Sequence, residues 1–312
     1  MNSLIFKRVK TKTTLSYNNF DKYLFLLIAV GPVLAGYILF GLFPNILTLF
    51  YSFTRWDGIS PKIFVGLENY INILKDINMW TSLYHNLIIL IFVPVVTIIF
   101  SLFLAYALVN KGFKENKFYK VLFFFPNILP AIVITLLWSF IYDGEFGLLN
   151  AVLKLIGIDM QSFYWLADEK IAIFAVMVPM IWVQTGFYVV IFANAMMSIP
   201  KSLYELARLE GASHFKQMFQ ITIPLIWGVI KVAIIFTAVG TIKSFEYIFM
   251  LTNGGPYDST NVIGLYMFNM AFARNISHQY GYASAVGMFL FVVLVGINYI
   301  IDRLFSKEQS QF

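Results

Sequence analysis

The stretch SLYELARLEGASHFKQMFQITIP, residues 202–224, is a polar segment between two long apolar runs of the chain. Its ionisable side chains are Glu205, Arg208, Glu210, His214 and Lys216. The apolar runs on either side are long enough to need an apolar environment, whereas this segment needs water or a polar partner. The side of the apolar region on which the segment lies therefore decides how the chain is arranged.

The composition points to a membrane protein. The chain has 312 residues, of which 60% are hydrophobic and only 12% are charged, whereas a soluble domain has about 25% charged residues. Cysteine is absent, which excludes disulfides and thiolate metal sites, and the three histidines lie far apart in the sequence, so we predict no metal site. The basic residues responsible for the net charge of +6 flank the apolar runs, which favours membrane orientation over binding to nucleic acid.

Six apolar runs are long enough to cross a bilayer, which takes about 20 residues in a helix. Five of them carry no charge, and the sixth contains Lys231, Lys243 and Glu246. The first run is too long for a removed signal peptide and lacks a cleavage site. We therefore predict an all-α polytopic membrane protein with six transmembrane helices. The runs are residues 23–43, 87–109, 121–142, 171–197, 225–251 and 281–301.

The distribution of Lys and Arg predicts the orientation of these helices. If residues 1–22 are cytoplasmic, the inside segments hold fourteen Lys and Arg residues and the outside segments hold six, as the positive-inside rule requires. We therefore predict a single membrane domain over residues 23–304, cytoplasmic ends at residues 1–22 and 305–312, and a cytoplasmic loop at residues 200–224. In the outer loop before the second helix, residues 66–86 have the apolar spacing of a short helix lying along the outer surface.

Local signals predict two short helices in the cytoplasmic loop. Pro200 ends the preceding structure, and Ser202 followed by Glu205 fits a capping box for a first helix. Gly211 suits the left-handed position that ends a helix, and Ser213 fits the start of a second helix that ends before Pro224. The expected product is two helices that meet at a glycine bend.

This loop is either a solvated amphipathic segment or a docking element. Its apolar side chains form more apolar surface than a free loop exposes, and they are interspersed with charged residues. Such a patch suits a groove on a partner protein. The apolar side chains are Leu203, Tyr204, Leu206, Leu209, Phe215 and Phe219.

The segment YELARLEGASHFKQMFQITIPLI, residues 204–226, closely resembles the EAA loop of binding-protein-dependent ABC importer permeases. The residues that match the family pattern E-A-A-x-x-x-G and I-x-L-P are Glu205, Ala207, Gly211, Ile221 and Pro224. The departures are Leu206, Glu210 and Ile223, where the family has Ala, often Asp, and Leu. The resemblance implies a type I ABC importer fold and a coupling helix that enters a cleft of the ATPase subunit. The residues expected to make that contact are Tyr204, Glu205, Ala207, Arg208, Gly211, Ala212 and Phe215.

Other stretches are similar to carbohydrate-uptake permeases, in particular to the first permease subunit of maltose-type importers. They are VGLENYINILKD (residues 65–76), FFFPNILPAIVITLLWSFIYDGEFGLLN (123–150) and SFEYIFMLTNGGPYDST (244–260). The resemblance implies import of a sugar or oligosaccharide by alternating access across a bacterial cytoplasmic (inner) membrane. The implied partners are a second homologous permease, two nucleotide-binding ATPase subunits and an extracytoplasmic solute-binding protein. The extra spans and large outer domain of some maltose-type permeases are not expected here.

No P-loop motif, G-x-x-x-x-G-K-[ST], occurs in the sequence, so the chain has nothing with which to hold the phosphates of a nucleotide in that way. We expect ATP and Mg²⁺ to be bound by partner subunits. We predict that this chain has no cofactor and no catalytic residue, and that it is not itself an enzyme.

Polar residues inside the spans are the candidates for substrate binding. Lys243 and Glu246 lie three positions apart and so would share one helix face, where they either form an ion pair or line the pathway, and Lys243 there favours an acidic saccharide. Lys231 is expected to extend towards the cytoplasm. The remaining candidates bind sugar or make hydrogen bonds between helices. They are Asn127, which lies between two prolines, together with Gln184, Tyr188 and Asn194.

Three other functions compete with this interpretation. The first keeps the importer class but changes the cargo to glycerol phosphate or a polyol. The second is an ion-coupled secondary transporter that uses Lys243 and Glu246, although the sequence shows no inverted repeat of the kind common in that class. The third is a structural membrane anchor, which would leave the polar fifth helix unexplained.

Overall fold

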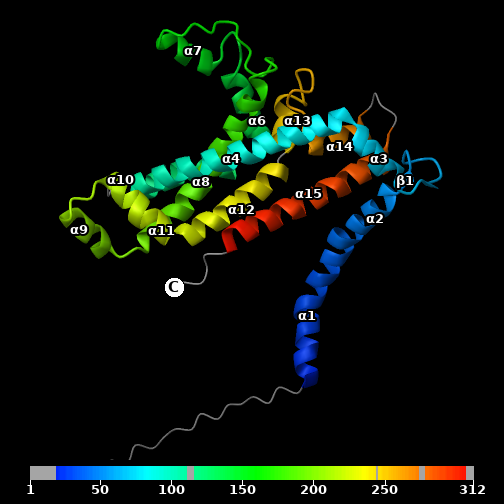
Figure 1. The fold of residues 1–312 in the computed structure, drawn as a ribbon, viewed down its shortest axis with the longest axis horizontal. Coiled ribbons are helices and arrows are strands. Elements are labelled where there is room, and N and C mark those ends of the chain that lie inside the picture. The colour runs from blue at the N-terminus through cyan, green and yellow to red at the C-terminus, as the bar shows by residue number, and fades with distance from the viewer. Residues whose placement is uncertain (1–18, 111–115, 244, 274–277, 307–312) are drawn as a thin grey trace, which may run out of the picture. The chain divides into compact units, whose positions relative to one another are not determined.

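The structure of the chain is a computed structural model that describes residues 19–110, 116–243, 245–273 and 278–306 (Figure 1). Apart from one short two-stranded hairpin, the regular structure in these ranges is helical, as predicted. The chain forms two compact units, Met1–Phe50 and Tyr51–Phe312.

The first unit consists of one long apolar helical segment. It comprises α1 (Asn19–Tyr37), a π-helical turn η1 (Ile38–Leu42) and most of α2 (Phe43–Ser52). The apolar part covers 30 residues, Tyr23–Ser52, and none of its most apolar stretch is buried inside the chain. The predicted span ended at residue 43, where the structure continues the helix. An apolar helix without intrachain cover needs lipid or another subunit around it.

Four helices form the body of the second unit (Figure 1). Helix α4 packs along α8 and also contacts α12, and α12 contacts α15. A buried cluster that contains Phe192, Met196 and Ile230 fills the space between α4, α8 and α12. The bounds are α4 (Ile77–Asn110), α8 (Ala172–Met197), α12 (Trp227–Lys243) and α15 (Tyr280–Ser306).

One bend lies inside the span predicted at residues 121–142, and a second lies at the start of the span predicted at residues 225–251. Helices α5 (Asn116–Ile128) and α6 (Ala131–Ile141) meet at 99°, and the helical segment that ends at Leu225 meets α12 at 76°. Pro130 explains the first bend, because proline has no amide hydrogen to donate and disfavours helical backbone at the residue before it. The described residues therefore contain four helices long and apolar enough to cross a membrane, or six if each bent pair is one span.

Helix α4 begins at Ile77, ten residues before the predicted start at residue 87. Polar side chains between residues 77 and 86 interrupt the apolar run from which the start was predicted. Two of them form hydrogen bonds with residues far along the chain. His85 Nδ1 donates to Asn261 O (2.8 Å), and Asn86 Oδ1 accepts from the Ile263 amide (2.8 Å). Asp76 caps the new start by accepting from the amide of Asn78 (3.0 Å).

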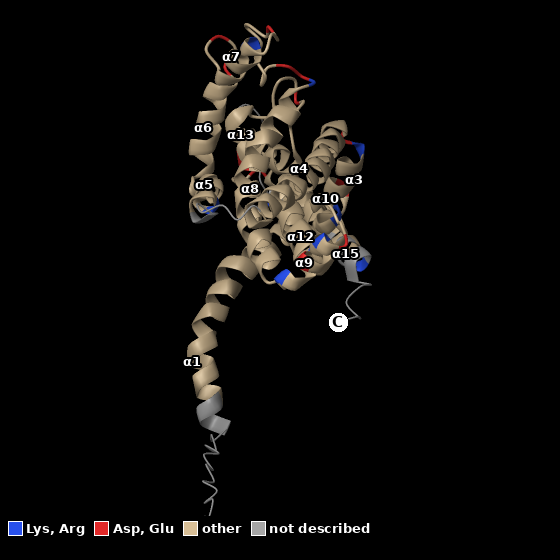
Figure 2. Cartoon of the chain, turned by 90° about the vertical axis from the view of Figure 1, so that its left-hand side faces the viewer, with Lys and Arg blue, Asp and Glu red and all other residues tan. Residues whose placement is uncertain are grey.

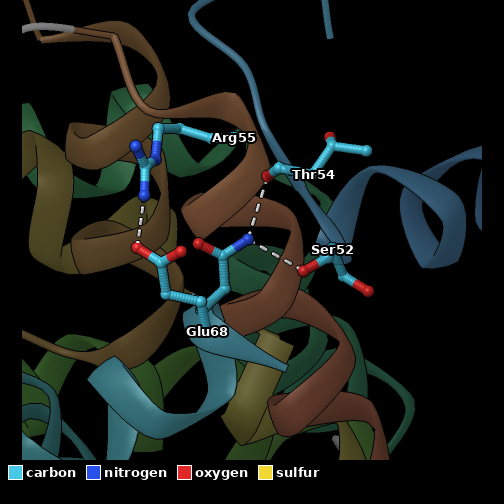
Figure 3. Close-up of polar contacts among 5 residues, drawn as sticks. Ser52, Thr54, Arg55 and Glu68 are labelled. Carbon is cyan, nitrogen blue, oxygen red and sulfur yellow. Dashed lines mark hydrogen bonds and ion pairs between the residues drawn. The ribbon is translucent and has the colours of Figure 1, made fainter. Parts of the chain in front are cut away.

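The loop before α4 is ordered by its own hydrogen bonds (Figure 3). Strands β1 (Thr54–Arg55) and β2 (Ile63–Phe64) pair antiparallel and are followed by the short helix α3 (Glu68–Lys75) that was predicted here. The buried Asn69 donates to the carbonyl oxygens of Ser52 and Thr54, both at 2.9 Å, and Arg55 forms an ion pair with Glu68.

Three more helices are α7 (Leu148–Leu155), α13 (Phe245–Leu251) and α14 (Ile263–Phe272). In the fifth predicted span, residues 225–251, helix is described up to Lys243 and again from Phe245, and Ser244 lies outside the described residues. The charged residues of the second unit gather mainly on segments such as those around α7 and α9 (Figure 2).

Candidate functional site

The polar segment at residues 202–224 forms two helical arms joined at a bend. We call residues 201–225, between α8 and α12, the α9–α11 segment. It lies at the end of α4 opposite to α3 and α14 (Figure 1). The prediction of two short helices is confirmed. The elements are α9 (Lys201–Leu209), α10 (His214–Gln217), a π-helical turn η2 (Met218–Thr222) and α11 (Ile223–Leu225).

The predicted capping box at the start of α9 is wrong. Pro200 occupies the N-cap position, and α9 has no side-chain cap hydrogen bond. Because the helix starts directly after the proline, Ser202 already lies inside its first turn and is too far along to be the cap. The predicted helix end before Pro224 is also wrong, because the second arm continues through Pro224 to Leu225.

Gly211 makes the bend, as predicted. Its φ of +78° lies in the left-handed region, which residues with a Cβ atom adopt at a cost. The Gly211 amide donates to Arg208 O (3.0 Å) and the Ala212 amide donates to Ala207 O (2.8 Å), which is the hydrogen-bond pattern of a Schellman motif. Ser213 then caps α10 by accepting from the Lys216 amide (3.3 Å), also as predicted.

Side-chain hydrogen bonds hold the two arms together. Gln217, which is 1% exposed, donates from Nε2 to Ala212 O (2.8 Å), directly after the bend. The hydroxyl groups of Tyr204 in α9 and Thr222 in η2 are 2.8 Å apart and hydrogen-bonded. These contacts make the α9–α11 segment one unit instead of two independent helices.

A third hydrogen bond joins this unit to α4, one of the four helices that form the body of the second unit. The Tyr106 hydroxyl near the end of α4 donates to His214 O (2.8 Å). Met218 and the half-buried Tyr204 also pack against the cluster between α4, α8 and α12. A displacement of the segment is therefore transmitted directly to α4 and its neighbours.

The outer surface of this unit carries exposed apolar side chains among charged ones. Leu209 is 86% exposed, and Phe215 is 63% exposed. Leu206 and Phe219 are exposed as well, and the Phe215 and Phe219 rings pack against each other with centroids 5.0 Å apart. Exposed apolar side chains in contact with one another indicate an interaction surface.

The structure places all seven predicted coupling residues in this segment, but not all at its surface. Tyr204, Ala207 and Ala212 are half-buried, and Tyr204 serves as an anchor to the core. The four exposed members are Glu205, Arg208, Gly211 and Phe215.

The predicted pair Lys243 and Glu246 lies on either side of Ser244, which is outside the described residues, as is the Lys243 side chain. Lys243 is the last described residue of α12, and the exposed Glu246 lies in the first turn of α13. That the two side chains share one helix face stays a prediction.

The other predicted substrate residues are dispersed. Asn127 is exposed at the end of α5, beside the predicted break at Pro130, and Gln184 is half-buried on α8. Tyr188 is 5% exposed and stacks on Phe192 in the core, so its ring serves packing within this chain. Asn194 Oδ1 accepts from Lys120 Nζ (3.2 Å). Lys231 is 8% exposed, and its ammonium group lies 5.9 Å from the ring centroid of Trp227, one turn nearer the start of α12. Its extension towards the cytoplasm stays a prediction.

Comparison with known proteins identifies the class of this chain. Residues 97–309, which include the whole α9–α11 segment, match the family described as the binding-protein-dependent transport system inner membrane component. The chain belongs to this family.

Two relatives of this permease are similar over most of its length. The diacetylchitobiose uptake system permease protein NgcF of Streptomyces coelicolor is 35% identical, over 94% of this chain and 86% of its own. The trehalose/maltose transport system permease protein MalF of Thermococcus litoralis is 30% identical, over 86% of this chain and 89% of its own. A crystal structure of a bacterial ABC transporter involved in the import of the acidic polysaccharide alginate contains a chain with the same fold. That chain has a TM-score of 0.77 and 22% identity, with 94% of this permease and 98% of the other chain covered.

Sequence reasoning missed the residues that hold the α9–α11 segment of this permease in place. Gln217 and Thr222 lie inside the quoted stretch, where buried polar side chains look like ordinary solvated ones. Tyr106 lies in an apolar run, and its hydroxyl is the one signal that marked it as needing a polar partner. The identity of that partner, His214, depends on the fold, since 108 positions separate the two residues.

Proposed function

We propose that this permease is a membrane-spanning subunit of an ABC importer for a sugar or oligosaccharide. Its support is the function of its relatives: diacetylchitobiose uptake at 35% identity and trehalose/maltose transport at 30% identity, each over most of the chain. The resemblance of residues 244–260 to carbohydrate permeases agrees with this cargo class. Lys243 in the fifth predicted span keeps acidic saccharides in the panel of cargoes to be tested.

The observation that carries the mechanism is the rigid α9–α11 segment with its exposed apolar side chains. Leu209 and Phe215 project from a unit that hydrogen bonds tie to α4. Such a surface fits a cleft on a nucleotide-binding subunit, which would supply the ATP hydrolysis for which this chain has no P-loop. Closure of two such subunits would move the two coupling segments of the importer together and change which side of the pathway is open. This requires that ATP and the partners bind the two states with different affinity.

This proposal fixes the orientation and the remaining partners. The α9–α11 segment and both termini would lie in the cytoplasm, in agreement with the excess of Lys and Arg in those segments. A second, homologous permease would complete the pathway, and an extracytoplasmic solute-binding protein would deliver the cargo to the opposite side.

Site-specific cross-linking tests the mechanism, because the chain has no cysteine. With Leu209→Cys in the assembled importer, we expect a cross-link to a nucleotide-binding subunit and a yield that changes when ATP is added. The matched control is Leu155→Cys on α7, which is 87% exposed but lies in a predicted outer loop, and it should give no such cross-link.

The same two variants test the orientation in sealed membrane vesicles or cells. A membrane-impermeant thiol reagent added from outside should label Leu155→Cys and leave Leu209→Cys unlabelled. The opposite pattern would place the α9–α11 segment on the outer side and refute the coupling role. Saccharide uptake driven by an ion gradient without ATP would instead favour a secondary transporter.

A further inference from the structure

A cavity of about 470 Å³ lies near the start of α4, within the size range of small-molecule binding sites. Its walls come from three separate parts of the chain: the first turns of α4, the residues just before α8, and the loop between α13 and α14. His85, in its wall, precedes Tyr106 by 21 positions on α4, which corresponds to roughly 30 Å along a helix. The cavity is therefore remote from the coupling surface.

The loop that forms one wall holds Tyr257 in an unfavourable backbone conformation. Its φ of +47° lies in the left-handed region that bulky residues rarely adopt, whereas its neighbours Asn253 (+48°) and Asp258 (+61°) are residue types that adopt this region more readily. Such conformations persist when the surroundings impose them, and they concentrate at functional sites. Here the Thr252 and Thr260 hydroxyl groups hydrogen-bond each other (2.7 Å), and Thr260 also bonds Gly255 O (2.8 Å).

The result of this strain is a tyrosine displayed at the edge of the cavity. Tyr257 lines the cavity and is 91% exposed, so little of its ring is covered by this chain. Tyr84 on α4 contributes a second exposed ring to the same cavity. Two uncovered aromatic rings at one concave site offer apolar faces to a ligand.

Beside these rings lie polar side chains of the cavity wall. The His85 Nδ1–H group donates to the Asn261 carbonyl, and in a neutral ring Nε2 remains as an acceptor. Glu169 and Lys170, which are exposed, lie in the same wall. The cavity thus presents hydrogen-bonding groups as well as apolar faces.

The charges in the wall select among possible ligands. Glu169 and Asp258 are acceptors and Lys170 is a donor, so the wall carries both signs with a small negative excess, and a strongly anionic ligand gains little. A ligand with many hydroxyl groups and flat apolar faces matches this mixture, since hydroxyl groups both donate and accept. Pyranose rings have this character.

We propose that this cavity is an outer saccharide-binding subsite, in which Tyr84 and Tyr257 contact a pyranose ring and His85, Glu169 and Lys170 bind its hydroxyl groups. It is separate from the candidates inside the spans, Lys243, Glu246, Asn127, Gln184, Tyr188 and Asn194. The inference rests on the proposed function for the class of cargo.

Titration of the assembled importer in nanodiscs, without its solute-binding protein, tests this subsite. The probes are N,N′-diacetylchitobiose, maltose, trehalose and alginate pentasaccharide, and saturation-transfer NMR reports binding. We expect saturable binding of at least one probe. Tyr257→Ala should weaken it by about tenfold, whereas Tyr257→Phe, which keeps the ring, should change it by less than about threefold. Phe146→Ala, which removes an exposed ring outside the cavity wall, should leave it unchanged.

Three results would overturn the subsite. These are the absence of saturable binding, binding that Tyr257→Ala leaves unchanged, and a Tyr257→Ala effect confined to the affinity of the solute-binding protein. The last would make the loop a protein-docking surface. ATP-driven saccharide uptake by the same importer is measured in parallel. Uptake without binding at the cavity would refute the subsite alone. The absence of uptake for every probe would refute the proposed function.

Discussion

At the scale of single residues, Gly211 is the position on which the bend of the coupling segment depends. With φ at +78°, an alanine there is strained by about 1 kcal/mol. A proline is worse, because it requires a negative φ and removes the amide that donates to Arg208 O. We predict that Gly211→Pro inserts normally and still permits ATP hydrolysis, but lowers transport per ATP at least about fivefold, the low end of typical coupling energies. Uptake and ATPase rates in proteoliposomes measure this ratio.

Gly211→Ala is the graded control for this residue. A Cβ atom there would meet no other atom within 4 Å, so its effect is conformational and not steric. Transport per ATP by Gly211→Ala should therefore lie between the values for wild type and for Gly211→Pro. Normal transport by the proline variant would show that the bend has no part in coupling.

At the scale of elements, α4 and α10 are linked by the hydrogen bond from Tyr106 to His214 O (2.8 Å) and by contact between the Phe103 and Phe215 rings. Removing the donor with Tyr106→Phe leaves the apolar packing in place and costs about 1 kcal/mol. We predict that the α9–α11 segment becomes less well positioned and binds the nucleotide-binding subunit about fivefold more weakly, as measured by titration with the purified subunit. Tyr299→Phe, at an exposed position on α15, is the control. Equal affinities of both variants would refute this anchoring role.

At the scale of the whole molecule, Asp76 joins four elements of the second unit. It lies between α3 and α4 and accepts hydrogen bonds from Tyr266 in α14 and from Tyr282 in α15 (2.7 Å for Tyr282). Partial burial raises the pKa of Asp76, but the two tyrosine hydroxyl groups and the α4 amides outweigh this and hold the pKa below its ordinary value. A lowered pKa in the folded state stabilises the fold above the unfolded pKa of about 3.9. That contribution is lost as the pH falls through the folded value.

We predict that Asp76→Ala lowers the midpoint of thermal unfolding in detergent at neutral pH by roughly 2–4 °C, for a loss on the order of 1 kcal/mol after solvent screening. The difference from wild type should disappear at pH values below the folded pKa of Asp76, because wild-type Asp76 is then protonated. Asp159→Ala is the matched control, since Asp159 is exposed and bonds only the nearby Gln161 amide (3.1 Å). A constant difference at all pH values would show that the carboxylate charge is not involved.

Some of this protein could be predicted from the sequence by itself, because the signals are local. The length of the apolar runs predicts that the chain lies in a membrane and that six of its segments are long enough to cross it. The bend at Gly211 follows from the left-handed backbone that a glycine permits, and the Ser213 cap follows from its hydroxyl group. The family resemblance of residues 204–226 rests on the same local pattern.

The tertiary structure decided what depends on distant partners. Helix α4 starts ten residues early because His85 and Asn86 find partners 176 and 177 positions away, and hydropathy cannot register a polar group that is satisfied in this way. The attachment of the α9–α11 segment through Tyr106, and the cavity beneath Tyr257, likewise arise where separate stretches meet. The sequence by itself thus determined that the chain spans a membrane and where its polar segment bends, since both follow from neighbouring residues. Only the fold decided which polar groups are satisfied and which are left open to a ligand, since that depends on contacts between residues far apart in the chain.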